Sequence, residues 1–215
     1  MTVPRPVLVC FAVPEEAGPF RRLIGARADI TVLVTGMGPR NAGKAVRAAL
    51  PTVQPRLVLT CGFAGGLDPE LVTGTVVFAA AETGGLAQAL VALGARPVRF
   101  HCAARVAVTA SQKEALRRKT GADAVEMESE VIRAVCREQE IPSATVRVIS
   151  DAAGEDLPLD FNRLMTPEQT LDYGKVVWAV LSSPGRIGGL LKLQRQTKAA
   201  AQTLAVALLR VMDGG

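Results

Sequence analysis

Short runs of β-branched and aliphatic residues recur along this chain, and most of them are followed by a segment of helical composition. An apolar run of this length, bounded by turn residues, is typical of a strand that is buried on both faces. The predicted strands cover residues 7–13, 30–34, 57–61, 76–80 and 144–149, with a shorter strand ending in Glu126-Met127-Glu128. The predicted helices cover residues 17–24, 41–50, 86–93 and 111–119, and one more follows the short strand. This alternation predicts an α/β fold, a three-layer sandwich with a central mixed, largely parallel sheet.

Residues 99–110 are strand-like in composition and include His101, the only histidine of the chain. No second histidine and no acidic residue lies near it in the sequence, so we assign His101 a structural role rather than a catalytic or metal-binding one. Ser111 has Glu114 three residues after it, which predicts that Ser111 is the N-cap of the next helix.

The C-terminal residues 190–212 carry apolar side chains at helical spacing. One face of the predicted helix holds Leu190, Leu193, Ala200, Leu204, Leu208 and Val211. Thr197 is the one polar residue in this stripe, and a helical threonine can return its hydroxyl to a backbone carbonyl. We therefore expect a helix that covers the sheet. Residues 1–215 are predicted to form a single domain in which residues 163–215 are a C-terminal helical extension.

Composition narrows the class of protein. With 215 residues, of which 49% are hydrophobic, the chain is long enough for one domain with a full core, and disorder is excluded. The net charge of +5 would suit an anionic partner, but the lysines and arginines are spread along the whole chain. Without aromatic interleaving or a helix-turn-helix pattern, we expect no nucleic-acid binding.

The four cysteines have no CxxC spacing, which predicts buried free thiols rather than a disulfide framework or a zinc site. We expect no metal and no cofactor. Prolines at positions 4, 6 and 14 interrupt the apolar N-terminal stretch, and no run reaches membrane-spanning length. These features predict a cytoplasmic protein.

Acidic residues follow several of the predicted strands. Glu128 and Asp151 bracket the helical unit in the second half of the chain, and Glu15 and Glu16 follow the first strand. In open α/β sheets, ligands bind where strands end, because the loops there gather polar groups over a rigid base. Acidic residues at a helix start can also simply complement the helix dipole. Glycine-rich turns after the second and third strands allow a close backbone approach to a ligand or to another strand.

Five motifs in order make this pattern more specific. They are VPEE after the first strand, TGMGP after the second, CGFAGGL after the third, AVEMES before the long helix and RVISD at the last strand. Together they resemble the purine nucleoside phosphorylase and nucleosidase superfamily, and within it the branch that cleaves methylthioadenosine and adenosylhomocysteine. The PLDFN segment and the apolar, basic tail resemble the hopanoid-associated members, thought to remove adenine from adenosylhopane. The resemblance extends to about Asn162.

The resemblance implies a role for each matching residue. Asp151 matches the acid that protonates N7 of the leaving purine, and Ser150 matches a residue that helps to hold the base. Glu128 matches the glutamate that binds the ribose hydroxyls, and Met127 the methionine that packs on the sugar. Glu16 matches the glutamate that activates the attacking water, with Glu15 as the neighbouring alternative.

These implied roles agree with the chemistry of the reaction, because cleaving a purine riboside requires protonation of a poor leaving group while positive charge grows on the sugar. Glu126 is left open. It either faces away from the ligand or supports its neighbours, because residues alternate across a strand. Phe63 and Gly65, both in the CGFAGGL motif, are expected at the substrate.

The chain departs from the family pattern at three places. Phe63 stands where the family usually has a serine that contacts water or phosphate. Thr60 stands where the phosphorylases have an arginine. A phosphate nucleophile needs cationic or dense hydrogen-bond donors, so these changes favour hydrolysis, although Arg40 or an arginine of a neighbouring subunit could still hold phosphate. The family's purine-contacting loop, which follows a strand near Val108, is shortened here to residues 110–112. That the base of the substrate is adenine is therefore an expectation from the resemblance alone.

The sequence thus predicts an N-ribosyl hydrolase that acts on an adenine nucleoside with an apolar 5′ substituent. Phe63 and the apolar tail at residues 176–191 suggest the substituent, and the tail cations Arg186, Lys192 and Arg195 could rest on an anionic membrane surface. The alternatives are a methylthioadenosine/adenosylhomocysteine nucleosidase, a phosphate-dependent phosphorylase, or a non-catalytic nucleoside-binding relative. The resemblance also implies a homo-oligomer.

Overall fold

A computed structural model describes residues 5–80, 85–164, 166 and 187–214 of the chain. Eight strands form one sheet. They are β1 (Val7–Phe11), β2 (Ile30–Val34), β3 (Leu57–Gly66), β4 (Val76–Ala80), β5 (Arg96–Pro97), β6 (Phe100–Cys102), β7 (Ala124–Glu126) and β8 (Ser143–Asp151). The helices of the described residues are α1 (Pro14–Ile24), α2 (Gly38–Val53), α3 (Leu86–Ala92), α4 (Ala110–Thr120), α5 (Ser129–Glu138), α6 (Phe161–Leu164) and α8 (Ile187–Asp213).

The main strand order is β2-β1-β3-β8-β4-β5, with β7 beside β3 and β6 beside β7. The neighbours β1 and β2, β1 and β3, and β3 and β8 run parallel. β4 is antiparallel to β8, and β7 is antiparallel to β3. The predicted mixed, largely parallel sheet is therefore confirmed.

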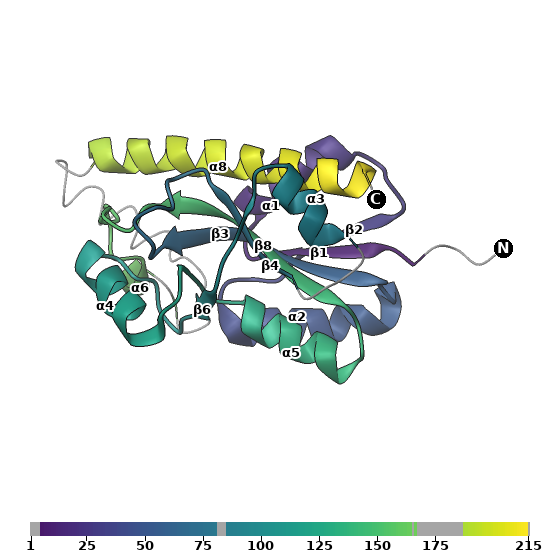
Figure 1. Ribbon diagram of the computed structural model, residues 1–215. Helices are drawn as coiled ribbons and strands as arrows, with labels where there is room; N and C mark the ends of the chain where they lie inside the picture. Colours follow the sequence, from purple (N-terminus) through teal and green to yellow (C-terminus); the bar gives the residue numbers. More distant parts are fainter. Residues whose placement is uncertain (1–4, 81–84, 165, 167–186, 215) are drawn as a thin grey trace.

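Helices cover both faces of the sheet (Figure 1). α1, α3 and α8 lie on one face, where Phe20, Leu90 and Leu204 pack on strand residues such as Val9 and Val146. α2 and α5 lie on the other face, where their side chains form a second apolar cluster with strand residues of β1 and β3. Because both faces are covered, the strands read as continuous apolar runs rather than as alternating ones. The three-layer prediction is confirmed.

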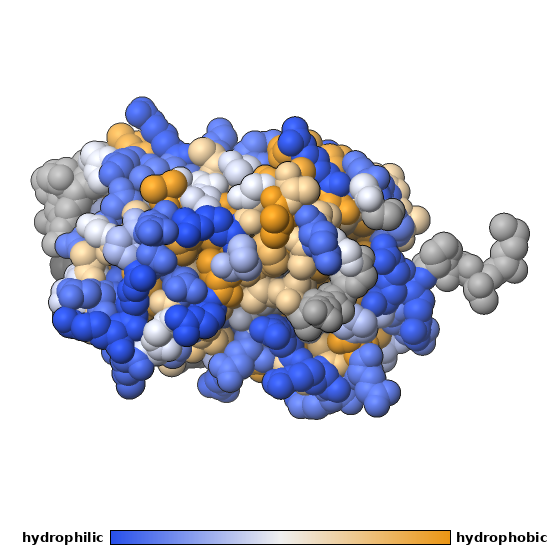
Figure 2. All heavy atoms as spheres, in the orientation of Figure 1, coloured by the Kyte–Doolittle hydropathy of each residue, from blue (hydrophilic) through white to orange (hydrophobic). Residues whose placement is uncertain are grey.

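Apolar and hydrophilic side chains gather over different elements of the surface. Figure 2 shows apolar surface gathered in the middle of one face, over β4 and α3, while hydrophilic side chains cover the regions of α4 and α5. Among the described residues, no helix is both long enough and apolar enough to cross a membrane. All four cysteines are free; three of them are buried and Cys102 is partly buried.

Several predicted boundaries were wrong. β1 ends at Phe11, and α1 begins at Pro14, so Glu15 and Glu16 lie inside its first turn. β3 does not end at residue 61 but continues to Gly66, because its last two residues pair with β7 on one side while β8 continues along the other. β7 ends at Glu126, and Glu128 is the N-cap residue of α5.

The strand-like segment at residues 99–110 is a strand only over Phe100–Cys102. From Val106 on, most of its backbone N–H groups bond to side chains instead of to a neighbouring strand. Asn162 accepts from the Val106 N–H and donates to the Val106 carbonyl, both at 2.9 Å. The N-cap of α4 is Thr109, whose hydroxyl accepts from the Gln112 N–H at 3.2 Å, and the prediction of Ser111 was wrong. Thr109, two residues before Ser111, forms a capping box with Gln112, which lies three residues after it.

The C-terminal helix is confirmed as α8, which runs from Ile187 to Asp213 and places Ala200, Leu204 and Leu208 in the core. Thr197 donates its hydroxyl to the Leu193 carbonyl at 2.9 Å, as the pattern predicts. Most of the apolar tail at residues 176–191, together with Arg186, lies outside the described residues.

Candidate active site

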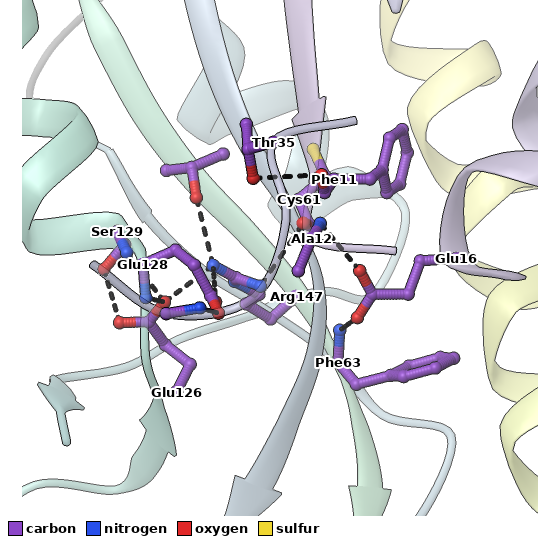
Figure 3. Close-up of polar contacts among 12 residues, drawn as sticks. Phe11, Ala12, Glu16, Thr35, Cys61, Phe63, Glu126, Glu128, Ser129 and Arg147 are labelled. Atoms are coloured by element: carbon purple, nitrogen blue, oxygen red, sulfur yellow. Dashed lines mark hydrogen bonds and ion pairs between the residues drawn. The ribbon is translucent and has the colours of Figure 1, made fainter. Parts of the chain in front are cut away.

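The parallel strands β1, β3 and β8 end at one edge of the sheet, and the Glu16 side chain reaches that edge from α1. Glu16 Oε2 accepts from the backbone N–H groups of Ala12 at 3.0 Å and Val13 at 3.3 Å. Glu16 Oε1 accepts from the N–H of Phe63 in β3 at 2.8 Å (Figure 3). Backbone amides from two neighbouring segments therefore hold this carboxyl group in one place.

Glu16 is only 5% exposed, whereas Glu15 is exposed to solvent. Burial raises the pKa of Glu16 to about 7, against the opposing effects of the Arg147 guanidinium and of the amide hydrogen bonds. A carboxyl group that titrates near neutral pH can accept a proton during a reaction at that pH. Of the two neighbouring glutamates, Glu16 is the buried one that is held by backbone amides, which suits a base.

Arg147, on β8, approaches Glu16 at Gly62. A Cβ atom at position 62 would lie 2.7 Å from Glu16 Oε1 and 2.8 Å from Arg147 Nη1. Gly62 has φ 140°, a backbone conformation that favours glycine. The missing side chain at this position therefore allows the carboxyl and the guanidinium to come together beside β3.

The Arg147 side chain is buried and binds several acceptors. Its Nη2 donates to Glu126 Oε2 at 2.6 Å and to Thr60 Oγ1 at 3.1 Å, and lies 3.4 Å from Glu128 Oε2. Its Nη1 donates to the Cys61 carbonyl at 3.3 Å. Sequence reasoning missed Arg147. The available signal was an arginine inside a strand that is otherwise apolar, because arginine is rarely buried without a charged partner.

Glu126 supports this arrangement from β7. Its Oε1 accepts from the Ser129 hydroxyl at 2.7 Å, and its Oε2 accepts from the backbone N–H groups of Ser129 at 2.8 Å and Glu128 at 3.0 Å. Burial alone would raise the pKa of Glu126, but Arg147 and these hydrogen bonds lower it below the ordinary value. Of the two interpretations left open for Glu126, the structure favours support of its neighbours.

Glu128 binds the glycine-rich turn that precedes α2. Its Oε1 accepts from the backbone N–H of Gly38 at 2.9 Å. Burial raises the pKa of Glu128, although Arg147 acts in the opposite direction. Met127, beside it in the sequence, is also buried. The buried cluster thus holds the carboxyl groups of Glu16, Glu126 and Glu128 around a single guanidinium (Figure 3).

Asp151 is the last residue of β8 and has two side-chain partners. Its Oδ1 accepts from the Ser150 hydroxyl at 2.6 Å, and its Oδ2 lies 2.5 Å from Lys113 Nζ. Lys113 comes from α4 and is completely buried. Gly65 lies against the same carboxyl group, because a Cβ there would be 3.3 Å from Asp151 Oδ2. Sequence reasoning missed Lys113, which sits in a charged helix with no pattern to distinguish it.

Asp151 also lines a cavity of about 790 Å³. The walls come from the loop after β8, from the start of α4 and from α8, and include Val108, Leu157 and Leu193. Arg147 and Asp151 are four residues apart on β8, about 13 Å at the usual rise per residue. The structure therefore brings Arg147 into contact with Glu128, with Glu16 beside them at Gly62, and places Asp151 farther along the same strand, at this cavity.

Phe63 donates its backbone N–H to Glu16. Its side chain points away from Arg147, on the opposite side of β3 (Figure 3). The partly buried ring packs against the apolar cluster that contains Leu204 of α8. Arg40, which we considered as a phosphate ligand, is exposed in the first turn of α2. Among the described residues, no group of three or more histidine, cysteine, aspartate or glutamate side chains is arranged to hold a metal ion.

A buried cluster of carboxylates with one cation suits a reaction in which positive charge develops on the substrate, because fixed negative groups stabilise such charge in a site that excludes water. Carboxylates that flank a glycosidic bond supply this stabilisation together with proton transfer. The arrangement can therefore act on a sugar whose ring becomes cationic.

The chain is similar to known nucleosidases. A 5′-methylthioadenosine/S-adenosylhomocysteine nucleosidase of Glaesserella parasuis serovar 5 (strain SH0165) is 25% identical over 188 residues, 72% of this chain and 81% of the relative. A Helicobacter pylori nucleosidase mutant of this kind, solved with 5′-methylthioadenosine in the active site, has a TM-score of 0.74 at 16% identity and covers 99% of this chain. The match spans 100% of that protein.

The H. pylori futalosine hydrolase has a TM-score of 0.72 at 16% identity, and the match covers 98% of each chain. At this identity the two solved structures support the fold. The family model described as the phosphorylase superfamily matches residues 11–89 and 79–182, which is most of the chain. On this match, together with a sheet and helices arranged as in the solved nucleosidases, the chain belongs to the phosphorylase superfamily.

Proposed function

We propose that this protein is a purine nucleosidase that hydrolyses the N-glycosidic bond of an adenine nucleoside. The observation that carries the proposal is Glu16, a buried carboxyl group with a pKa of about 7 held by three backbone amides at the strand ends. The similar proteins named above are methylthioadenosine/adenosylhomocysteine nucleosidases and a futalosine hydrolase, which supports a hydrolytic reaction here.

In this proposal Glu16 activates water. Above pH 7 its carboxylate accepts a proton from a water molecule as the water oxygen bonds to C1′ of the ribose. The amides of Ala12, Val13 and Phe63 fix the orientation of the carboxylate, so that little reorganisation is needed when the proton arrives. Arg147, which lies beside Gly62 as Glu16 does, supplies the balancing positive charge.

The ribose and the base bind to the two other acidic positions. Glu128 accepts hydrogen bonds from the ribose 2′- and 3′-hydroxyls, which strengthen as the ring becomes cationic, and Met127 packs on the sugar. Asp151 gives a proton to the leaving purine, and Ser150 holds the Asp151 carboxyl group in position. Gly65 leaves room for this carboxyl group against β3.

The proposal also concerns the chemical nature of the 5′ substituent. Phe63 replaces a small polar residue of the family with a partly buried ring that packs toward α8. A nucleoside with an apolar 5′ substituent, such as adenosylhopane, would bury its substituent against such a surface. 5′-Methylthioadenosine and adenosylhomocysteine are the alternative substrates, since two relatives of this chain are named for them.

Hydrolysis is favoured over phosphorolysis because Arg147 already binds carboxylates. Its Nη2 contacts Glu126 and Glu128, and its Nη1 contacts a backbone carbonyl. A phosphate dianion in the same place would have to compete with these buried carboxylates for the guanidinium.

The test is adenine release from a panel of adenosines with methylthio, homocysteinyl, long alkyl or unmodified 5′ positions, each measured with and without phosphate. Hydrolysis gives a free reducing sugar at a rate independent of phosphate. A requirement for phosphate, with a sugar 1-phosphate as product, would show a phosphorylase instead. Purine binding without any turnover would show a non-catalytic relative.

Glu16→Gln and Glu15→Gln form a matched pair for this assay. Glu16→Gln is expected to lower kcat by roughly 100-fold or more, the usual effect of losing a general base. Glu15→Gln removes the same charge from the adjacent, exposed position and should keep nearly full activity. Equal losses in both variants would argue against Glu16 as the base.

A further inference from the structure

Lys113 is the least expected residue of the site. It lies in α4, has no exposed surface, and its Nζ contacts three oxygen atoms. These are Asp151 Oδ2 at 2.5 Å, the Ala152 carbonyl at 2.7 Å and the Glu155 carbonyl at 2.8 Å. An ammonium group has three N–H donors, so each donor has one acceptor. Lys113 has no donor left for a substrate and can act only through Asp151.

The surrounding oxygen atoms suit a proton on either Lys113 Nζ or Asp151 Oδ2. With the proton on Nζ, an ammonium donates to two carbonyls and one carboxylate. With the proton on Oδ2, a neutral amine still donates to the carbonyls of Ala152 and Glu155, and its lone pair accepts from the Asp151 hydroxyl. Neither state leaves a buried donor or acceptor unpaired, which would be costly. The proton can therefore move between the two groups without rearrangement of the loop.

The other charged groups around this cavity already have partners. Glu155 accepts from Lys192 of α8 at 3.0 Å and from the Ala152 N–H, and Asp156 accepts from the Ala110 N–H at 2.7 Å. Asp160 pairs with Arg163 at 3.3 Å. Farther along α4, Arg117 pairs with Asp68 at 2.8 Å. Within the described residues, Lys113 is the cation in direct contact with Asp151.

We propose that Lys113 is a positioning residue that shares one proton with Asp151 and so provides the proton taken by the leaving base. As the C1′–N bond breaks, its electron pair goes to the purine. Asp151 transfers a proton to the purine nitrogen, and Asp151 receives a proton from Lys113, which is left as a neutral amine. The amine is protonated again from solvent after the base leaves, while Glu16 releases the proton that it took from water. This inference rests on the proposed nucleosidase function.

The first test compares two leaving groups. Lys113→Met keeps an unbranched side chain of similar length without the amine, and Lys119→Met removes an exposed lysine from the same helix as the control. A nitrophenol leaves a riboside as a stable anion and needs no proton, whereas adenine does. Lys113→Met is expected to lower kcat for the best adenine nucleoside by about 100-fold, with KM changed less than about 3-fold. Its hydrolysis of the nitrophenyl riboside that carries the same 5′ group should stay within about 3-fold of the wild type.

The second test is the pH profile of the Lys113→Met rate divided by the wild-type rate. Glu16 is present in both proteins, so its effect cancels in the ratio. Without Lys113, Asp151 must take its proton from solvent, and the ratio is expected to rise as the pH is lowered from 8 to 5.5. The activity of Asp151→Asn should not recover in this way at low pH. The double variant Lys113→Met/Asp151→Asn should be no slower than Asp151→Asn alone.

Lys113→Arg separates proton supply from simple support, because arginine keeps the charge and the donors but does not give up a proton. We expect Lys113→Arg to be slow on the adenine nucleoside and normal on the nitrophenyl riboside, and it serves alone if Lys113→Met does not fold. Full activity of Lys113→Arg or of Lys113→Met, equal losses on both substrates, or a pH ratio that stays flat would overturn the inference. A wild-type protein that releases no adenine from any nucleoside would overturn the proposed function itself.

Discussion

Glu16 and Arg147 meet at Gly62, where a single Cβ atom would lie within 3 Å of both side chains. The two residues come from different elements, α1 and β8, and a side chain at position 62 would displace both. The positions of the proposed base and of the buried guanidinium therefore depend on one glycine in the CGFAGGL motif.

Gly62→Ala is expected to destabilise the protein by about 2–3 kcal/mol, because overpacking a buried site forces its neighbours to move. The φ of 140° adds backbone strain to the close contacts. Urea unfolding measures the loss, and kcat should fall as Glu16 is displaced. Gly188→Ala is the control, since a Cβ there meets nothing within 4 Å. An active, fully stable Gly62→Ala protein would contradict the close approach of both side chains to position 62.

The pH dependence of activity should report Glu16. With a pKa raised to about 7 by burial, Glu16 becomes a carboxylate as the pH passes through that value. We expect kcat/KM for adenine release to rise about tenfold per pH unit below pH 7 and to level off above it. Glu15→Gln should keep this profile. A profile that is level from pH 5 to pH 8 would exclude Glu16 as the base.

Glu16 should also affect stability with a defined sign. Its pKa is higher in the folded protein, about 7, than the ordinary value of 4.5 expected after unfolding. The folded state therefore binds the proton more tightly, and stability falls as the pH rises from 4.5 to 7. The full difference corresponds to roughly 3 kcal/mol. The difference in unfolding free energy between wild type and Glu16→Gln should change by this amount across that window and stay constant above it.

Glu126→Ala is expected to cost about 3–5 kcal/mol, because removing one partner of a buried ion pair leaves an uncompensated charge. Arg147 would lose its contact at 2.6 Å, and the N–H groups of Glu128 and Ser129 would lose their acceptor. Glu138→Ala breaks an exposed pair with Arg47 and should move the urea midpoint little. Similar midpoints for the two variants would contradict a structural role for Glu126.

Phe63→Ser should change the choice of substrate. If the ring contacts an apolar 5′ substituent, its loss should raise KM for the long-alkyl adenosine by roughly 10- to 100-fold, the usual range for a hydrophobic pocket contact. KM for unmodified adenosine should change much less, and the Phe63 amide remains available to Glu16. An equal change for both nucleosides would place the substituent elsewhere.

Much of the fold could be predicted because apolar runs alternate with helical segments, and burial on both faces leaves a direct trace in sequence. The same pattern could not predict that β4 runs antiparallel to β8 and β7 antiparallel to β3, since an apolar run carries no direction. It also overextended the strand at residues 99–110, where Asn162 rather than a strand supplies the hydrogen bonds.

The sequence by itself predicted Glu16, Glu128 and Asp151 as the acidic residues of one site, because each stands at or just after a predicted strand in a motif that resembles the family. Only the tertiary structure decided what surrounds them. Arg147 and Lys113 are separated by many residues from the carboxylates they contact, and neither position in the sequence names its partner. The role of each arises from burial, which makes a cation depend on specific partners, and burial is a property of the packed chain.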